Sequence, residues 1–249
     1  MINVDAPTLL MIAAAYLIAA LVKGVTGLGF SSTCLPILVF AAGLKTALPL
    51  VIIPSIASNL VVMRQAGDVV GAVWQFWPML IATVPGLLIG LYFLSAVDGG
   101  RLAAVLGLVL ILYALFTLAR PHVALSGGFG RLLAMPVGFT TGLVNGLTGS
   151  QVMPVLPYLM ALNLPPQRFV QSINCMFTLS SLVMVSGLAT LGLATLETTV
   201  ISIAGLVCVA VGVRLGAQIR ERLNAQTFRR VVLWVLMALG ASLLIQEVI

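Results

Sequence analysis

Two stretches of the sequence repeat nearly the same glycine-broken phrase, and only the first contains a cationic side chain. Residues 21–30 read LVKGVTGLGF and residues 143–152 read LVNGLTGSQV, which places Lys23 opposite Asn145. Where a helix breaks at glycine and a new helix starts, free backbone N–H groups and the positive end of a helix dipole favour an anion. The two stretches therefore predict an anion site. Lys23 would supply the one full positive charge of this site, and Asn145 would supply a neutral amide.

The glycines and small polar residues after each break are the next candidates for this site. Inside a bilayer, unwound backbone is tolerated where protein buries it or where it lines a wet cavity. Asparagine amides in the middle of apolar runs likewise need polar partners. The candidate substrate-binding residues are Lys23, Thr26, Gly27, Gly29, Ser31, Ser32, Asn59, Asn145, Thr148, Gly149, Ser150, Gln151 and Asn174.

Each of these residue types also has a structural interpretation, which stays open at this point. Lys23 can snorkel to a membrane surface while its stem stays in the apolar phase. Glycines three apart, such as Gly24 and Gly27, allow two helices to approach closely. Serine in a membrane helix commonly bonds to its own preceding turn. Helix packing is the interpretation we favour for four further glycines, Gly86, Gly90, Gly212 and Gly216.

The composition places the chain in a membrane. Of its 249 residues 61% are hydrophobic and 7% are charged, and the mean hydropathy is +1.21. Soluble domains carry about 25% charged residues, so this chain lacks the charge to cover a water-exposed surface. The net charge of +6 is scattered between apolar runs, which argues against nucleic-acid binding and makes the charge a topology signal.

Apolar runs divide the chain into eight spans and two shorter pieces. A bilayer core of about 30 Å needs roughly 20 helical residues. The shorter pieces, 31–43 and 150–162, have 13 residues each, or about 20 Å as helix, so we expect each to be a half-helix after a glycine break. The expected spans are residues 8–27, 46–63, 72–94, 101–118, 131–148, 169–190, 197–218 and 229–246.

The two halves of the chain align as an internal duplication. Residues 20–63 slide onto 142–185 without a gap. Each half then holds four spans and one half-helix, an odd number of segments, which inverts the second half relative to the first. We expect an all-α polytopic membrane protein with a first repeat over 1–118, a cytoplasmic linker over 119–131 and a second repeat over 132–249.

The distribution of positive charge favours the inverted arrangement. It places eight Lys and Arg residues on one side and two, Lys45 and Arg101, on the other. An arrangement of eight spans without half-helices places five Lys and Arg residues on one side and three on the other. It also leaves Lys45 and Arg168 inside the membrane. Because basic loops stay cytoplasmic, we expect both termini to lie outside.

The inventory of reactive side chains argues against catalysis. All six carboxylates fall in loops, termini or helix ends, and the single histidine, His122, lies in the central loop. A metal site or a Ser-His-Asp arrangement cannot be assembled from these residues within the membrane. We therefore expect no enzyme activity and no cofactor.

The sequence resembles the TauE/SafE family, the sulfite and sulfonate exporter group of bacterial membrane proteins. The resemblance rests on LVKGVTGLGFSSTCLPILV near the N-terminus, on its second copy GLVNGLTGSQVMPVLPYL, and on the late segment VGVRLGAQIRERL. It covers nearly the whole chain. It implies passage of small sulfur-containing anions across the bacterial inner membrane, mostly outward.

Three hypotheses about function stay open. The first is a transporter of a small anion, either sulfite or an organosulfonate, by facilitated or ion-coupled export. The second keeps the fold but moves another small metabolite or inorganic anion. The third is a non-transporting membrane subunit. For the partners we expect a small anionic substrate and the lipid bilayer, with no nucleic acid, and a homo-oligomer stays open.

Overall fold

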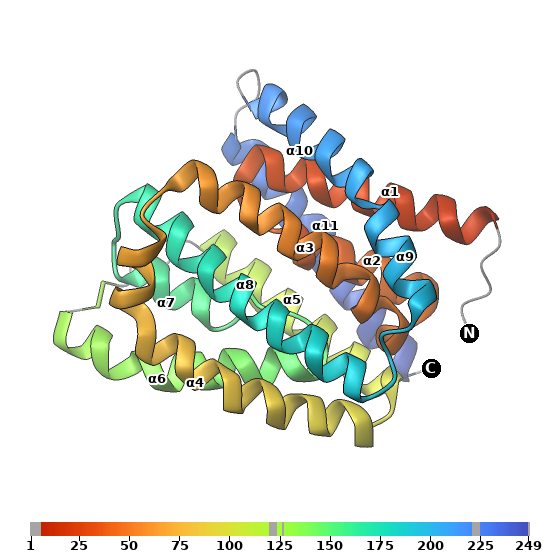
Figure 1. Cartoon of the computed structure of the whole chain (residues 1–249), viewed down its shortest axis with the longest axis horizontal. Coiled ribbons are helices and arrows are strands. Elements are labelled where there is room, and N and C mark those ends of the chain that lie inside the picture. The colour runs from red at the N-terminus through yellow and green to blue at the C-terminus, as the bar shows by residue number, and fades with distance from the viewer. Residues whose placement is uncertain (1–5, 120–123, 126, 221–224, 249) are drawn as a thin grey trace.

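The computed structural model describes residues 6–119, 124–125, 127–220 and 225–248, and every regular element in this part of the chain is an α-helix. Figure 1 shows the helices side by side in one bundle. The helices are α1 (Ala6–Thr26), α2 (Phe30–Ala42), α3 (Leu44–Ala66), α4 (Val69–Ala96), α5 (Gly99–Ala119), α6 (Gly127–Thr148), α7 (Val155–Ala161), α8 (Pro166–Thr190), α9 (Leu196–Ala204), α10 (Leu206–Arg220) and α11 (Ala225–Val248).

Seven stretches within the described residues are long and apolar enough to cross a membrane. They are α1, α3, α4, α5, α8, residues 196–219 across α9 and α10, and residues 227–247 of α11. The protein is therefore a multi-pass membrane protein. The expected span 131–148 forms most of α6, which has 22 residues but is not among the seven. Its sequence includes the polar residues Arg131, Thr140, Thr141 and Asn145, which lower the mean hydropathy of the helix.

The two expected half-helices differ in the structure. The piece 31–43 becomes α2, a helix of 13 residues that begins one residue earlier. The prediction of a half-helix over residues 150–162 is wrong over its first part, because α7 has 7 residues and begins at Val155. The physical reason is Pro154, since the residue before a proline is disfavoured in helical conformation. Residues 149–154 therefore cross this region as irregular backbone.

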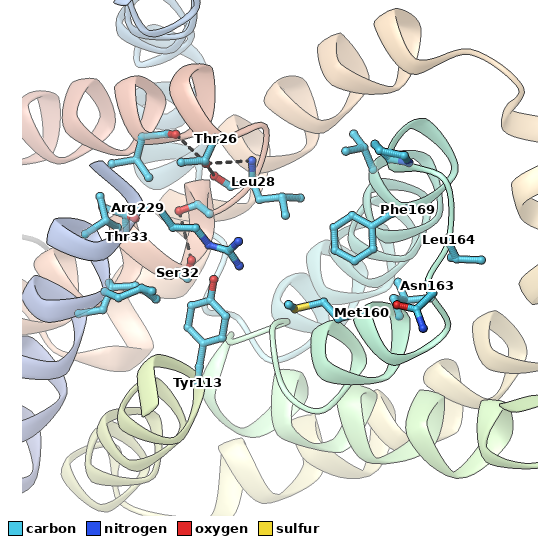
Figure 2. A pocket seen from close by; sticks show the side chains of 18 residues that line it. Thr26, Leu28, Ser32, Thr33, Tyr113, Met160, Asn163, Leu164, Phe169 and Arg229 are labelled. Carbon is cyan, nitrogen blue, oxygen red and sulfur yellow. Dashed lines mark hydrogen bonds between the residues drawn. The ribbon is translucent and has the colours of Figure 1, made fainter. Parts of the chain in front are cut away.

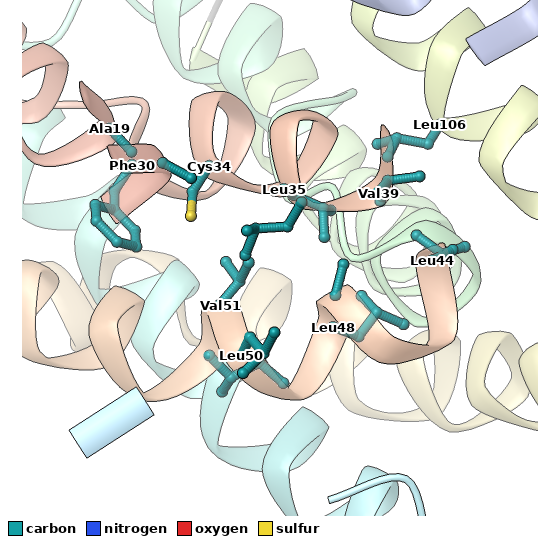
Figure 3. Packing of buried hydrophobic residues seen from close by; sticks show 14 of the residues in the cluster. Ala19, Phe30, Cys34, Leu35, Val39, Leu44, Leu48, Leu50, Val51 and Leu106 are labelled. Atoms are coloured by element: carbon teal, nitrogen blue, oxygen red, sulfur yellow. The ribbon is translucent and has the colours of Figure 1, made fainter. Parts of the chain in front are cut away.

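The half-helix α2 is held by its apolar side chains. Phe30, Cys34 and Leu35 are at most 2% exposed and belong to one buried cluster with Leu48 and Val51 of α3. Figure 3 shows these side chains between the two helices. Packing of this kind stabilises the broken segment in place of the backbone continuity that a full span would have.

A carbonyl released inside α3 connects three helices. Pro54 lies within α3 and has no N–H, so the Leu50 carbonyl one turn earlier loses its helical partner. The Tyr16 hydroxyl of α1 donates to this carbonyl oxygen at 2.7 Å. The Ser202 hydroxyl of α9 lies 3.2 Å from the same oxygen. The Ser202 hydroxyl is closer to the Thr198 carbonyl oxygen of its own helix, at 2.7 Å, so Tyr16 is the donor that satisfies the carbonyl freed by the proline, with Ser202 beside it.

Glycines bring two helix pairs into backbone contact. A Cβ added to Gly24 of α1 would lie 2.8 Å from the Gly216 Cα of α10, and one added to Gly90 of α4 would lie 2.7 Å from the Gly146 Cα of α6. In the repeat alignment Gly24 corresponds to Gly146, and in a second aligned block, PGLLIG (85–90) on VGVRLG (211–216), Gly90 corresponds to Gly216. The packing interpretation of these glycines is confirmed. The crossed contacts are those that a two-fold related duplication would make, while the inversion itself stays a prediction.

Charged residues gather at the two ends of the bundle. At one end Arg168 pairs with Asp68 at 2.8 Å, near the α3–α4 and α7–α8 connections on the left of Figure 1. At the other end Arg101 lies 4.0 Å from Glu247. There Asp98 accepts a hydrogen bond from the Gly100 N–H at 2.8 Å, and backbone donors, this one first, lower the pKa of Asp98.

The central linker is shorter than expected, because α6 begins at Gly127, inside the predicted range 119–131. Residues 120–123 and 126, and with them His122, lie outside the described residues. The side of the membrane on which this linker lies stays a prediction.

Backbone contact between α4 and α6 should make Gly146 sensitive to a single methyl group. We expect Gly146→Ala to lower the free energy of unfolding by about 1–3 kcal/mol, the usual cost of overpacking. Thermal unfolding of the purified protein in detergent measures this. The matched control is Gly128→Ala in the same helix, where an added Cβ meets no atom within 4 Å. Equal melting temperatures for the two variants would contradict the close packing.

The predicted topology can be tested by cysteine labelling. In a chain whose native Cys34, Cys175 and Cys208 are replaced by alanine, Ala124→Cys should react with an impermeant thiol reagent only after the membrane is opened. Ala96→Cys, at the other end of the bundle, should react in intact cells. Both positions are exposed. Labelling of position 124 in intact cells would overturn the inverted arrangement.

Candidate functional site

The centre of the candidate site is the buried ammonium group of Lys23. The residue lies one turn before the end of α1 and is 2% exposed. Its Nζ donates to the Oδ1 of Asn59 on α3 and lies 3.2 Å from the Oδ1 of Asn174 on α8. The structure therefore joins three of the predicted residues from three helices, and it excludes a surface position for Lys23.

The surroundings of Lys23 supply no counter-charge. The ion pairs in the described part of the chain are Arg101–Glu247 and Arg168–Asp68, both at the ends of the bundle. The Asn174 Nδ2 donates to the Val170 carbonyl oxygen at 2.8 Å, which turns the amide oxygen toward Lys23. Amide oxygens carry only partial charge, so a protonated Lys23 would be a buried charge without an ionic partner, which is costly.

The first glycine break lies directly after Lys23. The Gly27 N–H returns to the Lys23 carbonyl oxygen at 2.7 Å, and both Gly27 (φ +76°) and Gly29 (φ +89°) adopt the left-handed region that favours glycine. The Thr26 Oγ1 lies 2.8 Å from the Val22 carbonyl oxygen and accepts a hydrogen bond from the Leu28 N–H at 3.2 Å. Thr26 thus connects the last turn of α1 to the break.

The second break repeats this local geometry. The Gly149 N–H returns to the Asn145 carbonyl oxygen at 2.7 Å, and Gly149 has φ +76°. The Thr148 Oγ1 lies 2.7 Å from the Val144 carbonyl oxygen and accepts from the Ser150 N–H at 3.2 Å. The Thr26 and Thr148 hydroxyls therefore have the same structural use in the two copies, and neither needs a ligand to satisfy it.

The start of α2 faces a small cavity, called here the inner cavity. The first helical hydrogen bond runs from the Thr33 N–H to the Gly29 carbonyl oxygen at 3.1 Å, so the N–H groups of residues 30–32 precede it. The cavity measures about 10 Å³, room for about one water molecule. It is lined by Lys23, Gly29, Phe30, Ser31, Ser32, Asn59, Gln151, Val152 and Phe177. The Asn59 Nδ2 is buried and lacks a partner.

A second cavity of about 10 Å³, called here the second-copy cavity, adjoins the first. Ser31 and Gln151 line both cavities. The Gln151 Nε2 donates to the Ser181 Oγ at 3.0 Å, and the Ser31 Oγ lies 2.7 Å from the Ser55 Oγ. Ser31, directly after the first glycine phrase, and Gln151 of the second phrase therefore lie between the two cavities. Both amide atoms of Asn145 and the Ser150 hydroxyl, in the second phrase, are buried and have no hydrogen-bond partner.

A larger cavity of about 440 Å³, called here the vestibule, opens beside this site. Gly29 and Ser32 line both the vestibule and the inner cavity. Figure 2 shows the Arg229 guanidinium of α11 reaching into the vestibule, with the Tyr113 hydroxyl of α5 next to it. The sequence analysis identified neither residue as part of a site.

The predicted site residues leave out Gln171, Thr178 and Ser181, although these three share a periodic pattern with the predicted Asn174. Gln171, Asn174, Thr178 and Ser181 are spaced three, four and three apart on α8, which places them on one helical face. The buried amide of Gln171 has no partner at either atom. On α3, Ser55 lies four residues before Asn59. A search for polar stripes at helical spacing would have found both faces.

The groups gathered in this arrangement are an ammonium group, helix-terminal N–H groups, hydroxyls and neutral amides. Ammonium and helix-terminal N–H groups are groups that favour an anion. Within the described residues no three His, Cys, Asp or Glu side chains lie together as metal ligands would.

One of three comparisons with known proteins identifies a family for the chain. The family described as the sulfite exporter TauE/SafE family matches residues 12–243. No curated protein and no solved structure matches the chain. Because the family match spans nearly all of the described bundle, both glycine breaks included, the chain belongs to the TauE/SafE sulfite exporter family of membrane transporters.

Proposed function

We propose that this protein exports sulfite, or an oxyanion of similar size, across the bacterial inner membrane, with the anion bound against Lys23. One observation carries the proposal. The Lys23 ammonium is 2% exposed and contacts only neutral amide oxygens in the described part of the chain. A substrate anion would supply the missing counter-charge, and the N–H groups that precede the first turn of α2 would add to its binding.

The size of the inner cavity favours a small substrate. A cavity of about 10 Å³ holds a water molecule rather than a polyatomic anion, so the helices around it must separate before substrate enters. A compact inorganic oxyanion requires the smallest separation. The organic part of a sulfonate would need more space among Phe30, Val152 and Phe177, the apolar residues of the lining.

Membrane voltage supplies enough free energy for this export. Proton relays in membrane pumps are usually built from buried carboxylates, and the sequence places all six carboxylates in loops, termini or helix ends. An anion that leaves a cell with a negative interior gains about 2.3 kcal/mol per charge at 100 mV. This supports roughly fiftyfold outward accumulation of a monoanion. The proposed mechanism is therefore electrogenic facilitated efflux.

Removal of the Lys23 charge should weaken substrate binding. Lys23→Met keeps the apolar stem and removes the ammonium, so the sulfite concentration for half-maximal transport should rise at least about thirtyfold, or about 2 kcal/mol. Radiolabelled sulfite uptake into membrane vesicles measures this change. Lys23→Arg should also lower transport, because a planar guanidinium replaces a compact ammonium in a tight site.

A matched control for these variants is Arg214→Gln. Arg214 is a cation of the α10 span, but its side chain is exposed, as expected for a residue that snorkels. This variant should transport as the parent does. If the sulfite concentration for half-maximal transport is the same in Lys23→Met as in the parent, Lys23 has a structural role only.

Efflux should also respond to the membrane potential. Proteoliposomes loaded with sulfite should release it faster when a potassium diffusion potential makes their interior negative, because the anion moves down the electrical gradient. The control is the same measurement with protein-free liposomes. Efflux that ignores the potential and stops when a proton or sodium gradient is removed would contradict the uncoupled mechanism.

A further inference from the structure

The vestibule has a cation that the site around Lys23 does not use. Among the described residues its lining contains one charged side chain, that of Arg229, in the fifth position of α11. No carboxylate lines the vestibule in the described residues, and no ion pair in the described part of the chain involves Arg229. The guanidinium therefore faces a cavity of about 440 Å³ that can receive an anion together with its water.

Hydroxyl groups surround this guanidinium. Figure 2 shows Tyr113, Ser32 and Thr33 on the side of the vestibule where Arg229 enters. Thr33 is 4% exposed, and its hydroxyl oxygen is itself buried, so this hydroxyl does not open onto the vestibule. The accessible part of the lining thus combines a cation with the Tyr113 and Ser32 side chains on one wall.

The vestibule also has a defined place in the path of a substrate. Arg229 lies at the start of α11. Phe169, at the start of α8, lines the side of the vestibule opposite Arg229 in Figure 2, and Pro166 of the same helix also lines the vestibule. The topology prediction places these helix ends on the cytoplasmic side. Gly29 and Ser32 connect the vestibule to the inner cavity. An anion in the vestibule would therefore be between the cytoplasm and Lys23.

We propose that the vestibule is a second anion-binding site, in which Arg229 and Tyr113 bind the oxyanion as it enters from the cytoplasm and before it reaches Lys23. The direction of entry rests on the proposed export function, whereas binding to Arg229 does not. The site differs in kind from the one at Lys23. It is wide and hydrated, so it binds weakly and releases readily, and it raises the local concentration of anion beside the closed inner cavity.

Direct binding to the purified full-length protein tests this site. In the Lys23→Met background the inner site is weakened, so sulfite binding measured by calorimetry should report the vestibule. Adding Arg229→Gln should weaken that binding about tenfold, the effect of losing one charge-assisted hydrogen bond. Adding Arg229→Lys should weaken it about threefold, because the charge stays and the fork of donors is lost.

Arg230→Gln is the matched control, because Arg230 is the next residue, has the same charge and is exposed outside the vestibule lining. It should leave binding unchanged. Tyr113→Phe, which keeps the ring and removes the hydroxyl, should weaken binding about threefold and serves as the second variant if Arg229→Gln does not fold. Absence of sulfite binding in the Lys23→Met background, or equal effects of Arg229→Gln and Arg230→Gln, would overturn the proposal.

Transport from each face separates this inference from the proposed function. With the Lys23 site intact, Arg229→Gln should raise the half-saturating sulfite concentration about tenfold in inverted vesicles, whose outer face is cytoplasmic. It should leave the value unchanged in right-side-out vesicles. A parent that binds sulfite at the vestibule but does not transport it would remove the proposed function and retain the vestibule site. An effect confined to right-side-out vesicles would overturn entry through the vestibule.

Discussion

The buried ammonium group of Lys23 is the constraint on which the rest of the site depends. A cation in a low-dielectric interior costs several kcal/mol unless opposite charge and hydrogen bonds compensate it, and here Asn59 and Asn174 provide only amide oxygens. These two contacts require α1, α3 and α8 to converge at one depth in the bundle. They also leave the charge partly uncompensated, and this residual deficit is what the proposed substrate anion would balance.

Glycine serves two opposite purposes around this point. Gly24 and Gly146 lie inside regular helices and bring α1 against α10 and α6 against α4 at backbone distance. Gly27 and Gly149 follow the ends of α1 and α6, Gly29 precedes the start of α2, and all three have positive φ angles. Because lipid tails provide no hydrophobic drive between helices, close van der Waals contact is what holds such pairs together. The rigid pairs can therefore support two broken segments whose backbone polar groups line cavities.

The breaks are alike in local geometry, yet their surroundings differ. After the first break, α2 has 13 residues and presents a helix start to the inner cavity. After the second, residues 149–154 are irregular and α7 has 7 residues. The second copy therefore contributes side chains, Gln151 above all, rather than a helix dipole. The two copies differ in charge in the same way, because Lys23 and the helix start both belong to the first copy, whereas the second copy has the neutral Asn145.

The sequence by itself determined the membrane class, the all-α fold, most of the helix bounds and the family, because apolar runs and glycine patterns are local properties of the chain. It also singled out Lys23, Asn59 and Asn174, since polar groups in hydrocarbon are conspicuous. Only the tertiary structure decided that these three meet, that Thr26 and Thr148 bond to their own breaks, and that Arg229 and Tyr113 enter a shared vestibule. The physical reason is that such contacts join helices distant along the chain, and helical periodicity gives the face of each helix but not its neighbour.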